Sequence, residues 1–553
     1  MCGIFAYIYR LQNDDDMNGY YNLELLKSFN KINKRGPDNT SSELSNNVFL
    51  GFHRLAINDI TSAGNQPMNY KDYSLICNGE IFNHKKIIDK YNFKTTSNSD
   101  CEVILHLYDY LFSKERSNND IIHKLCNELD GEFSFVLYDK NINSIFIARD
   151  PYGVRPLFIG KSVNNDYVFS SELKGLHKLT ESAEQFEPGT YMIIDNTLFG
   201  NEFDIIHKPY HKMNNDHKMI NEKYNLYDET DEIILKGLNN VFREAVYKRM
   251  MSDKEICSLL SGGLDSSLVA SIVSERLGPN KLKTFAIGIK GSPDLKYAQM
   301  VADHIKSVHH SIELTEKEFL EAIEEVIIAI ESYDTTTVRA SVGNYLVSKY
   351  IRNNTDCKVI FNGDYADEVC GGYKYFKKTQ DPIEFHNECV RLVNDIHYFD
   401  CLRSDRSISN NGLEARVPFA DKDFVEFYLS INPTLRMSYD KIEKCMLRKA
   451  FEKDNLLPEK VIWRSKEAFS DGVTVETRSW HQIIQEFVDT QITDEYFEQN
   501  KNKYDYNTPV LKESFYYREI FEKHYQGRGN VIPYFWMPKW CGDMTDPSAR
   551  EIS

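Results

Sequence analysis

The sequence lacks any apolar run near the length that crosses a bilayer. Its longest apolar stretches resemble residues 326–330, far below the roughly 18 residues required. Basic residues are also fewer than acidic ones, with 66 Lys and Arg against 83 Asp and Glu and a net charge of −17. Most of the surface therefore repels phosphate backbones and anionic lipid. We expect neither a membrane nor a nucleic acid among the partners.

The eleven cysteines include no C-x-x-C pair and no Cys/His cluster at zinc spacing. Their number is odd and they are scattered from Cys2 to Cys541, so neither a disulfide framework nor a zinc site is expected. No basic segment precedes the first apolar stretch, and three aspartates follow it at residues 14–16, unlike a signal or transit peptide. We expect a cytoplasmic protein.

The 553 residues suggest two to four domains, at about 150 residues per domain. Residues 2–200 read as an α+β domain in which Asn, Asp and Gly separate short strands. Strands are expected at residues 3–8, 48–52, 73–77, 133–138, 145–148 and 167–170, and helices at 22–32 and 101–111. Residues 201–227 are polar and weakly periodic, which favours a linker.

Residues 228–553 show a different pattern. After a helix at 230–250, strands at 255–260, 284–289, 309–313 and 358–362 alternate with helices at 268–277, 295–305 and 319–330. This alternation predicts a doubly wound α/β domain with a parallel sheet. Beyond residue 367 the pattern is mostly helical to about 525, and residues 527–553 are expected to be irregular and loosely held.

Cys2 follows the initiator methionine and is small enough for that methionine to be removed. The α-amine titrates near pH 7.7 to 8 and a free thiol near 8.5, so the amine can accept the thiol proton directly or through a water. Nucleophile and base would then belong to one residue. A cysteine at position 2 is weak evidence by itself, and four clusters further along the chain strengthen it.

The run at Cys2 and these four clusters make five short runs in all. They are Cys-Gly-Ile at 2–4, Arg-Gly-Pro-Asp at 35–38, His-Arg-Leu at 53–55, Asn-Gly-Glu-Ile at 78–81 and Ser-Asp-Cys-Glu at 99–102. They stand in the order found in class II glutamine amidotransferase domains. The first domain resembles these glutaminases, which implies the N-terminal nucleophile hydrolase fold, with layered antiparallel sheets and helices. Cys2 is then the expected nucleophile.

Hydrolysis of a side-chain amide requires an oxyanion hole, and the Asn78 amide with the Gly79 backbone N–H can supply two donors. The resemblance assigns the α-carboxylate of glutamine to Arg54 and its α-ammonium to Asp100, a division that suits a zwitterion. A surface turn at residues 78–79 and a helix N-cap at Asp100 are the plainer alternatives. The implied glutamine-binding residues are Arg54, Leu55, Ala56, Ile57, Asn58, Asn78, Gly79, Glu80 and Asp100.

Residues 259–267 read Leu-Leu-Ser-Gly-Gly-Leu-Asp-Ser-Ser between an expected strand and an expected helix. Glycines let the backbone approach a phosphate, and hydroxyls and helix N-terminal amides donate to an anion. The run lacks the G-x-x-x-x-G-K-[ST] spacing. It resembles instead the S-G-G-x-D-S loop of ATP pyrophosphatases, in which Asp265 would hold Mg²⁺.

Further runs lie at residues 334–341, 363–368, 414–419, 466–472, 517–519 and 546–550. With the first domain they make nearly the whole chain resemble glutamine-hydrolysing asparagine synthetases of the B type. The resemblance implies a ligase of asparagine biosynthesis. It would amidate L-aspartate with ammonia from L-glutamine through β-aspartyl-AMP, releasing AMP, pyrophosphate and L-glutamate. It also allows for a homodimer.

The same match implies the roles of particular residues. Asp265 and Asp367 would hold Mg²⁺, Lys466 would stabilise charge on the phosphates, Asp364 would serve the intermediate, and Thr336 and Arg339 would contact aspartate. The implied ATP-binding residues are Leu260, Ser261, Gly262, Gly263, Asp265, Ser266, Ile287, Asn362 and Gly363.

This chain departs from the family where Ser-Gly-Glu-Gly-Ser/Ala-Asp-Glu is usual. Residues 362–368 read Asn-Gly-Asp-Tyr-Ala-Asp-Glu. Asp364 shortens the carboxylate by one methylene, and Tyr365 places bulk where glycine can adopt φ > 0. Two alternatives therefore stay open: an amidotransferase that acts on another carboxylate, and a regulatory protein that binds nucleotide or glutamine with a degraded synthetase site.

Overall fold

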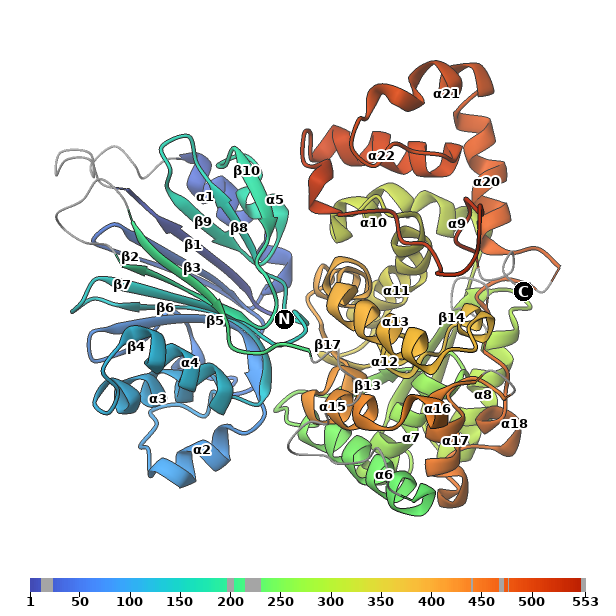
Figure 1. The fold of residues 1–553 in the computed structure, drawn as a ribbon, viewed down its shortest axis with the longest axis horizontal. Helices are drawn as coiled ribbons and strands as arrows, with labels where there is room; N and C mark the ends of the chain where they lie inside the picture. Colours follow the sequence, from blue (N-terminus) through green and yellow to red (C-terminus); the bar gives the residue numbers. More distant parts are fainter. Residues whose placement is uncertain are drawn as a thin grey trace. The chain divides into compact units, whose positions relative to one another are not determined.

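The computed structural model describes residues 1–10, 23–195, 203–213, 230–438, 441–466, 472–475 and 477–548. The chain divides into two compact units (Figure 1). The first contains Met1–Lys212, Met251–Lys254 and Ser409–Leu413; the second contains Met213–Met250, Glu255–Ile408 and Glu414–Ser553. Within the described ranges, every helix is too short or too polar to cross a bilayer.

The first unit contains two six-stranded sheets whose neighbouring strands are antiparallel. One has the order β10-β8-β9-β1-β3-β2 and the other β12-β11-β7-β6-β5-β4. The strands are β1 (Gly3–Ile8), β2 (Asn39–Ser45), β3 (Val48–Arg54), β4 (Met68–Tyr70), β5 (Tyr73–Ile81), β6 (Gly131–Asp139), β7 (Ser144–Arg149), β8 (Phe158–Lys161), β9 (Tyr167–Ser170), β10 (Ser182–Gln185), β11 (Thr190–Asp195) and β12 (Asp204–Pro209). The helices are α1 (Leu23–Asn30), α2 (His84–Tyr91), α3 (Glu102–Phe112), α4 (Asn118–Glu128) and α5 (Leu173–Leu176).

Side-chain alternation explains this layering. On β5, Ile76 joins a core cluster with Ile4 of β1, so it faces the space between the two sheets. Its neighbours Leu75 and Cys77 point to the opposite face and join a cluster with residues of α3 and α4, as the period of two in a strand requires. The predicted α+β class is confirmed, and each predicted strand and helix of this domain overlaps an observed one.

The structure differs from the expected linker at residues 201–227. Asp204–Pro209 form β12, which pairs antiparallel with β11 from Asp195↔Asp204 to Thr190↔Pro209. The first unit accordingly extends to Lys212. No residue of the strand is buried and most are exposed, so its weak hydrophobic signal gave no reason to expect it. Residues 201–202 and 214–227 of the expected linker lie outside the described residues.

The second unit is built on a parallel sheet of order β15-β14-β13-β16-β17. Its strands are β13 (Ile256–Leu259), β14 (Lys283–Ile289), β15 (Val308–Leu314), β16 (Val359–Phe361) and β17 (Glu414–Arg416). Its preceding and crossover helices are α6 (Asp231–Lys248), α7 (Leu264–Leu277), α8 (Pro293–Ile305), α9 (Glu316–Glu321), α10 (Ile323–Ile330) and α11 (Thr335–Asn354). The doubly wound prediction is confirmed, although the helix expected at 319–330 is two helices that meet at Ala322.

The strand order reverses between β13 and β16, which are hydrogen-bonded neighbours. In an open parallel sheet, such a switch point leaves a crevice beyond the carboxyl ends of the strands, where ligands bind. The sheet topology therefore points to the segments that follow Leu259 and Phe361.

The later part of the unit is mostly helical, as predicted. It contains α12 (Ala366–Cys370), α13 (Pro382–Asp395), the π-helical turn η6 (Leu402–Arg406), α14 (Ser407–Ser409), α15 (Lys422–Ser430), α16 (Pro433–Arg436), α17 (Cys445–Phe451), α18 (Glu459–Ile462), α20 (Trp480–Gln491), α21 (Asp494–Asn500) and α22 (Lys512–His524). Residues 532–548 lack regular structure but are not loosely held. The Trp536 N–H donates to Asp334 at 2.8 Å, and Asp546 pairs with Arg339 at 2.9 Å.

Candidate active sites

Cys2 lies at the start of β1, half-buried, and its thiol donates to the Leu55 carbonyl at 3.7 Å. The Arg35 Nε–H donates to the Cys2 carbonyl at 2.8 Å, and Arg35 itself is buried against Glu172 at 3.0 Å. A buried arginine with a fixed partner therefore holds the backbone of the expected nucleophile. The sequence pattern included Arg35 without suggesting this role.

Asn78 provides the strongest sign of a ligand in the first unit. It lies on β5, is fully buried, and neither its Nδ2 nor its Oδ1 atom has a hydrogen-bond partner among the described residues. A buried amide without partners is rare, and a bound group is one explanation for it. Beside it, a Cβ on Gly79 would come within 2.5 Å of the Glu132 carbonyl, so the strand itself requires glycine there.

Asn58, Glu80 and Asp100 form one cluster. Asn58 Nδ2 donates to Glu80 and, at 3.3 Å, to Asp100 Oδ1, while the Ile81 N–H donates to Asp100 Oδ2 at 2.6 Å. Both carboxylates are at least 95% buried. Two adjacent carboxylates with little solvent favour a cationic ligand group such as an α-ammonium.

Most of the guanidinium N–H donors of Arg54 bond to residues of the loop that follows it. Its Nη1 group donates to the Thr61 carbonyl at 2.6 Å and to Asn65 Oδ1 at 2.7 Å, and Nη2 donates to the Asp59 carbonyl. These bonds use three of the five N–H donors of a guanidinium. The remaining members of the predicted glutamine set follow β3 directly: Leu55 and Ile57 are buried, and Ala56 is half-buried.

In the second unit, residues 260–266, here called the phosphate loop, follow β13 and lead into α7. The Ser261 N–H donates to Ser266 Oγ at 3.1 Å, and the two hydroxyls lie 2.9 Å apart. Gly262 has φ +73°, and a Cβ there would come within 2.5 Å of the Ala298 backbone nitrogen. The loop thus presents hydroxyls and the N-terminus of a 14-residue helix to one point, which suits an anion.

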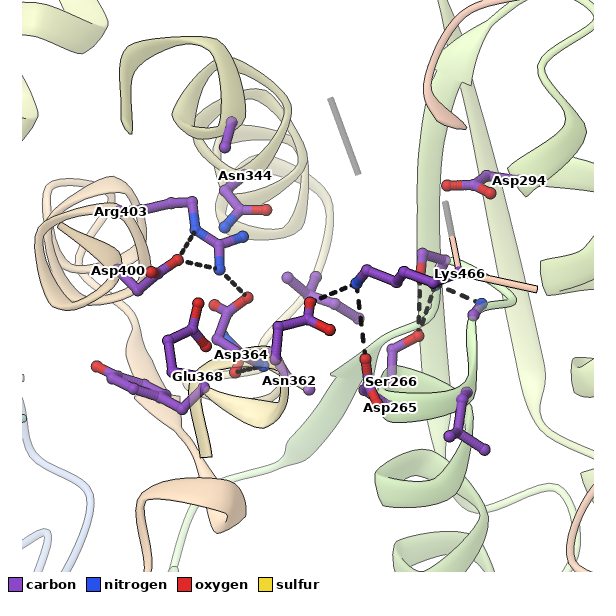
Figure 2. A pocket seen from close by; sticks show the side chains of 18 of the residues that line it. Asp265, Ser266, Asp294, Asn344, Asn362, Asp364, Glu368, Asp400, Arg403 and Lys466 are labelled. Carbon is purple, nitrogen blue, oxygen red and sulfur yellow. Dashed lines mark hydrogen bonds and ion pairs between the residues drawn. The ribbon is translucent and has the colours of Figure 1, made fainter. Parts of the chain in front are cut away.

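A pocket opens at the predicted switch point of the sheet (Figure 2). It brings together residues of the phosphate loop, β14, α11, the turn after β16, and segments near residues 400 and 444–466. The predicted site residues that line it are Leu260, Ser261, Gly263, Asp265, Ser266, Ile287, Thr336, Asn362, Gly363, Asp364, Asp367 and Lys466. Gly262 does not line it, and its carbonyl accepts a bond from Arg464 at 3.1 Å.

Two lysines neutralise the acids beside the phosphate loop. Lys444 Nζ lies 2.6 Å from Asp265 Oδ2 and 2.5 Å from Asp367 Oδ1, and Lys466 Nζ contacts Asp367 and lies 3.8 Å from Asp265. Burial raises the pKa of Asp367, but the two ammonium groups outweigh it, so this pKa lies below its usual range. Lys444 belongs to none of the motifs above, and sequence reasoning missed it.

The far end of the pocket is acidic. Figure 2 shows Arg403 pointing toward Asp364 and Asp400, and its Nη2 atom lies 2.8 Å from a carboxylate oxygen of each. The other oxygen of Asp364, Oδ2, is buried without a hydrogen-bond partner among the described residues. Burial raises the pKa of Asp364 against the attraction of Arg403, and burial with Asp400 nearby raises that of Glu368 well above its usual range.

Arg339 does not fit its expected contact with aspartate. It is absent from the pocket lining, is 5% exposed, and forms ion pairs with Glu513 at 2.6 Å and Asp546 at 2.9 Å. These partners lie far along the chain, so the local motif gave no hint of them. Thr336, one turn earlier on α11, does line the pocket, and its buried hydroxyl has no hydrogen-bond partner among the described residues.

Comparison with known proteins matches both parts of the chain to known families. Residues 1–230 match the family model described as a glutamine amidotransferase domain, and residues 237–383 and 378–541 match the model described as asparagine synthase. The chain is therefore an amidotransferase domain joined to a synthetase domain.

Curated relatives extend over the full length. The chain is 42% identical over 572 residues to "Asparagine synthetase [glutamine-hydrolyzing]" of Rattus norvegicus, covering 100% of this chain and 99% of the relative. The relatives of the same description from Homo sapiens and Gallus gallus are also 42% identical, over 577 and 571 residues, with 100% of this chain and 99% and 98% of the relatives covered. The chain belongs to the family of glutamine-hydrolysing asparagine synthetases.

Proposed function

We propose that this chain converts L-aspartate to L-asparagine with ATP, taking nitrogen from L-glutamine, through the residues described above. One observation carries the proposal: a single pocket has a phosphate loop with two neutralised carboxylates at one end and an acidic, arginine-held end opposite. Measuring asparagine, AMP and pyrophosphate together from the purified protein tests it. Equal amounts of the three are expected.

In the glutaminase site, removal of Met1 would give Cys2 a free α-amine as its base. The thiolate would attack the δ-amide carbon, and the Asn78 Nδ2–H and Gly79 N–H would donate to the developing oxyanion. Collapse of this intermediate would break the C–N bond and release ammonia, with the α-ammonium returning the proton, and water would then hydrolyse the thioester to glutamate. The unpartnered amide of Asn78 supports this assignment. Asp100 and Glu80 would bind the α-ammonium, and the donors of Arg54 that its loop leaves would bind the α-carboxylate.

In the synthetase site, the phosphate loop would bind ATP so that the β-carboxylate of aspartate attacks the α-phosphorus. Pyrophosphate leaves, and β-aspartyl-AMP forms. Lys444 and Lys466 lie where they would balance the charge that develops on the phosphates. Ammonia would then attack the β-carbonyl and AMP would leave, with Asp364 Oδ2 accepting a proton. The unpartnered hydroxyl of Thr336 is the proposed aspartate contact on α11.

The acids beside the phosphate loop also fit Mg²⁺. Asp265 and Asp367 approach one ammonium nitrogen, and Asp265 Oδ1 is buried without a hydrogen-bond partner among the described residues. The described residues contain no group of three or more metal-ligating side chains. Mg²⁺ suits such a site, because it takes one or two carboxylates and completes its shell with substrate phosphates and water. Asp265 and Asp367 would hold it, and it would neutralise the leaving pyrophosphate.

Two alternatives make different predictions in the same assay. Pyrophosphate release that a carboxylate other than aspartate stimulates would favour an amidotransferase of different specificity. Binding of ATP and glutamine in a thermal-shift experiment, without pyrophosphate release, would favour a regulatory protein. The turn keeps a carboxylate at Asp364, which pairs with Arg403 at 2.8 Å, and this favours the enzyme.

A cytoplasmic location and a homodimer stay predictions. All eleven cysteines lie in described residues and carry free thiols, which suits a reducing compartment. Cell fractionation tests the location. The homodimer rests on the family resemblance alone, and light scattering coupled to size exclusion would test it through the mass of the particle.

A further inference from the structure

Three side chains of the turn between β16 and α12 contact one short segment at the start of η6. They are the side chains of Asn362, Asp364 and Tyr365. The contacts are Asn362 Nδ2 to Ser404 Oγ at 3.0 Å, Asp364 Oδ1 to Arg403 Nη2 at 2.8 Å, and Tyr365 Oη to Cys401 Sγ at 3.0 Å. The turn is therefore held by one partner segment.

Tyr365 is the member of this set with a strained backbone conformation. Its backbone has φ +74° and ψ −6°, in the left-handed region, and its side chain is 2% exposed. A bulky residue in this region is strained and persists only where its surroundings hold it. Its phenol O–H donates to the thiol of Cys401, which is itself 2% exposed. This hydrogen bond thus ties the turn to the N-cap of η6.

The position of the Asp364 carboxylate depends on this fixed turn. An aspartate carboxylate has one torsion fewer than a glutamate carboxylate with which to adjust to a substrate, so the backbone must place it. Its Oδ2 atom, buried without a hydrogen-bond partner among the described residues, is the atom that requires placement. A displacement near 1 Å at a reacting group can lower the rate by about 10²-fold.

We propose that Tyr365 and Cys401 are positioning residues of the synthetase reaction: their contact fixes the turn so that the short carboxylate of Asp364 presents Oδ2 to the pocket. The inference rests on the role proposed above for Asp364. Tyr365 also lines the pocket, but the proposed effect does not require it to contact a substrate. The pair acts through the backbone of the turn, in place of the reach that a glutamate would have.

Removal of the contact tests the proposal directly. Tyr365→Phe and Cys401→Ala should each lower kcat for AMP formation about 10-fold, with the KM for ATP within about twofold and glutaminase turnover unchanged. The double variant should fall no further than either single variant, because both remove one interaction. Cys401→Ser keeps an acceptor and should retain more activity than Cys401→Ala.

An exchange of residues gives a second test. Tyr365→Gly alone should lower kcat at least about 10-fold, because the anchor is lost while the carboxylate stays short. Adding Asp364→Glu to Tyr365→Gly restores the two residues usual in the family and should recover most of the rate. Asp364→Glu alone should not raise the rate, since the anchored turn would carry the longer side chain too far.

Matched controls separate positioning from general stability. Tyr525 is 3% exposed and donates its phenol O–H to the Ile328 carbonyl at 2.7 Å, outside the pocket. Tyr525→Phe and, at the fully buried Cys389, Cys389→Ala should leave kcat unchanged. An unchanged kcat in Tyr365→Phe would overturn the proposal. A second outcome would also overturn it. This is a loss of both synthetase and glutaminase activity in Tyr365→Phe that accompanies a lower thermal midpoint to the same extent as in the control variants.

Asp364→Asn separates failure of the inference from failure of the role it depends on. Full synthetase turnover in this variant would show that the proposed role of Asp364, and with it the inference, is wrong. Loss of turnover in Asp364→Asn together with an unaffected Tyr365→Phe would overturn only the inference.

Discussion

At the scale of single residues, the motifs identified the proposed reacting groups and the structure shows their neighbours. Cys2 and Asp265 stand where the sequence pattern predicted them, one at the start of a strand and one in the phosphate loop. Arg35 and Lys444, which hold them, come from other parts of the chain. Long-range pairs of this kind leave no local periodicity in a sequence.

Cys2→Ala should abolish asparagine formation from glutamine, because it removes the only proposed nucleophile of the glutaminase reaction. Asparagine formation from ammonium salts should stay within about twofold of wild type, since the synthetase residues are untouched. Paired assays with the two nitrogen sources measure this. Loss of both reactions would contradict separate sites.

Asp265→Asn should have the opposite effect. AMP and pyrophosphate formation should fall by about 10²-fold or more, because one of the two acids proposed to hold the metal loses its charge. Glutaminase turnover should persist. Asp303→Asn, at an exposed residue of α8 outside the pocket, is the matched control. Wild-type AMP formation by Asp265→Asn would show the metal assignment to be wrong.

At the scale of elements, α11 depends on its N-cap. Asp334 is fully buried; its Oδ2 accepts bonds from the Thr337 N–H at 2.9 Å and hydroxyl at 2.8 Å, and its Oδ1 accepts from the Trp536 N–H at 2.8 Å. One side chain thus caps the helix that carries Thr336 into the pocket and also ties down the C-terminal segment. The sequence pattern predicted no helix at residues 335–354, so neither α11 nor its cap was expected.

This cap predicts a pH dependence. Burial raises the pKa of Asp334 to about 6, above its value in the unfolded chain, so the folded state binds this proton more tightly. The resulting stabilisation is fully present below about pH 4 and is lost as the pH rises through 6. Asp334→Asn stays neutral and lacks this loss. The thermal midpoint of wild type, relative to the variant, should therefore fall between pH 4 and 6.5; a difference independent of pH would contradict this.

The predicted elements show where sequence patterns suffice. Buried strands such as β5 and β14 have long apolar or alternating runs, and their predicted positions agree with the structure. Mostly exposed strands such as β12 bury too little to leave a pattern. Arg339 shows the corresponding limit at the site, because its acidic partners on α22 and in the C-terminal segment decide its role.

At the scale of the whole molecule, the proposal requires one nitrogen atom to leave glutamine in the first unit and to appear in asparagine made by the second. With amide-¹⁵N glutamine and no added ammonium, the side-chain amide of asparagine should carry the isotope at the enrichment of the glutamine. Mass spectrometry of the product measures this. Unlabelled asparagine would exclude glutamine as the donor.

The left-handed backbone of Tyr365 has a consequence for the history of the family. Glycine occupies such a conformation freely, whereas a tyrosine there must find compensation in its surroundings. Lineages that exchange one for the other should therefore covary at position 401, keeping sulfur or a hydroxyl wherever the aromatic ring is present. A descendant that loses the thiol first would inherit the strain without the anchor, so the order of the two substitutions is constrained.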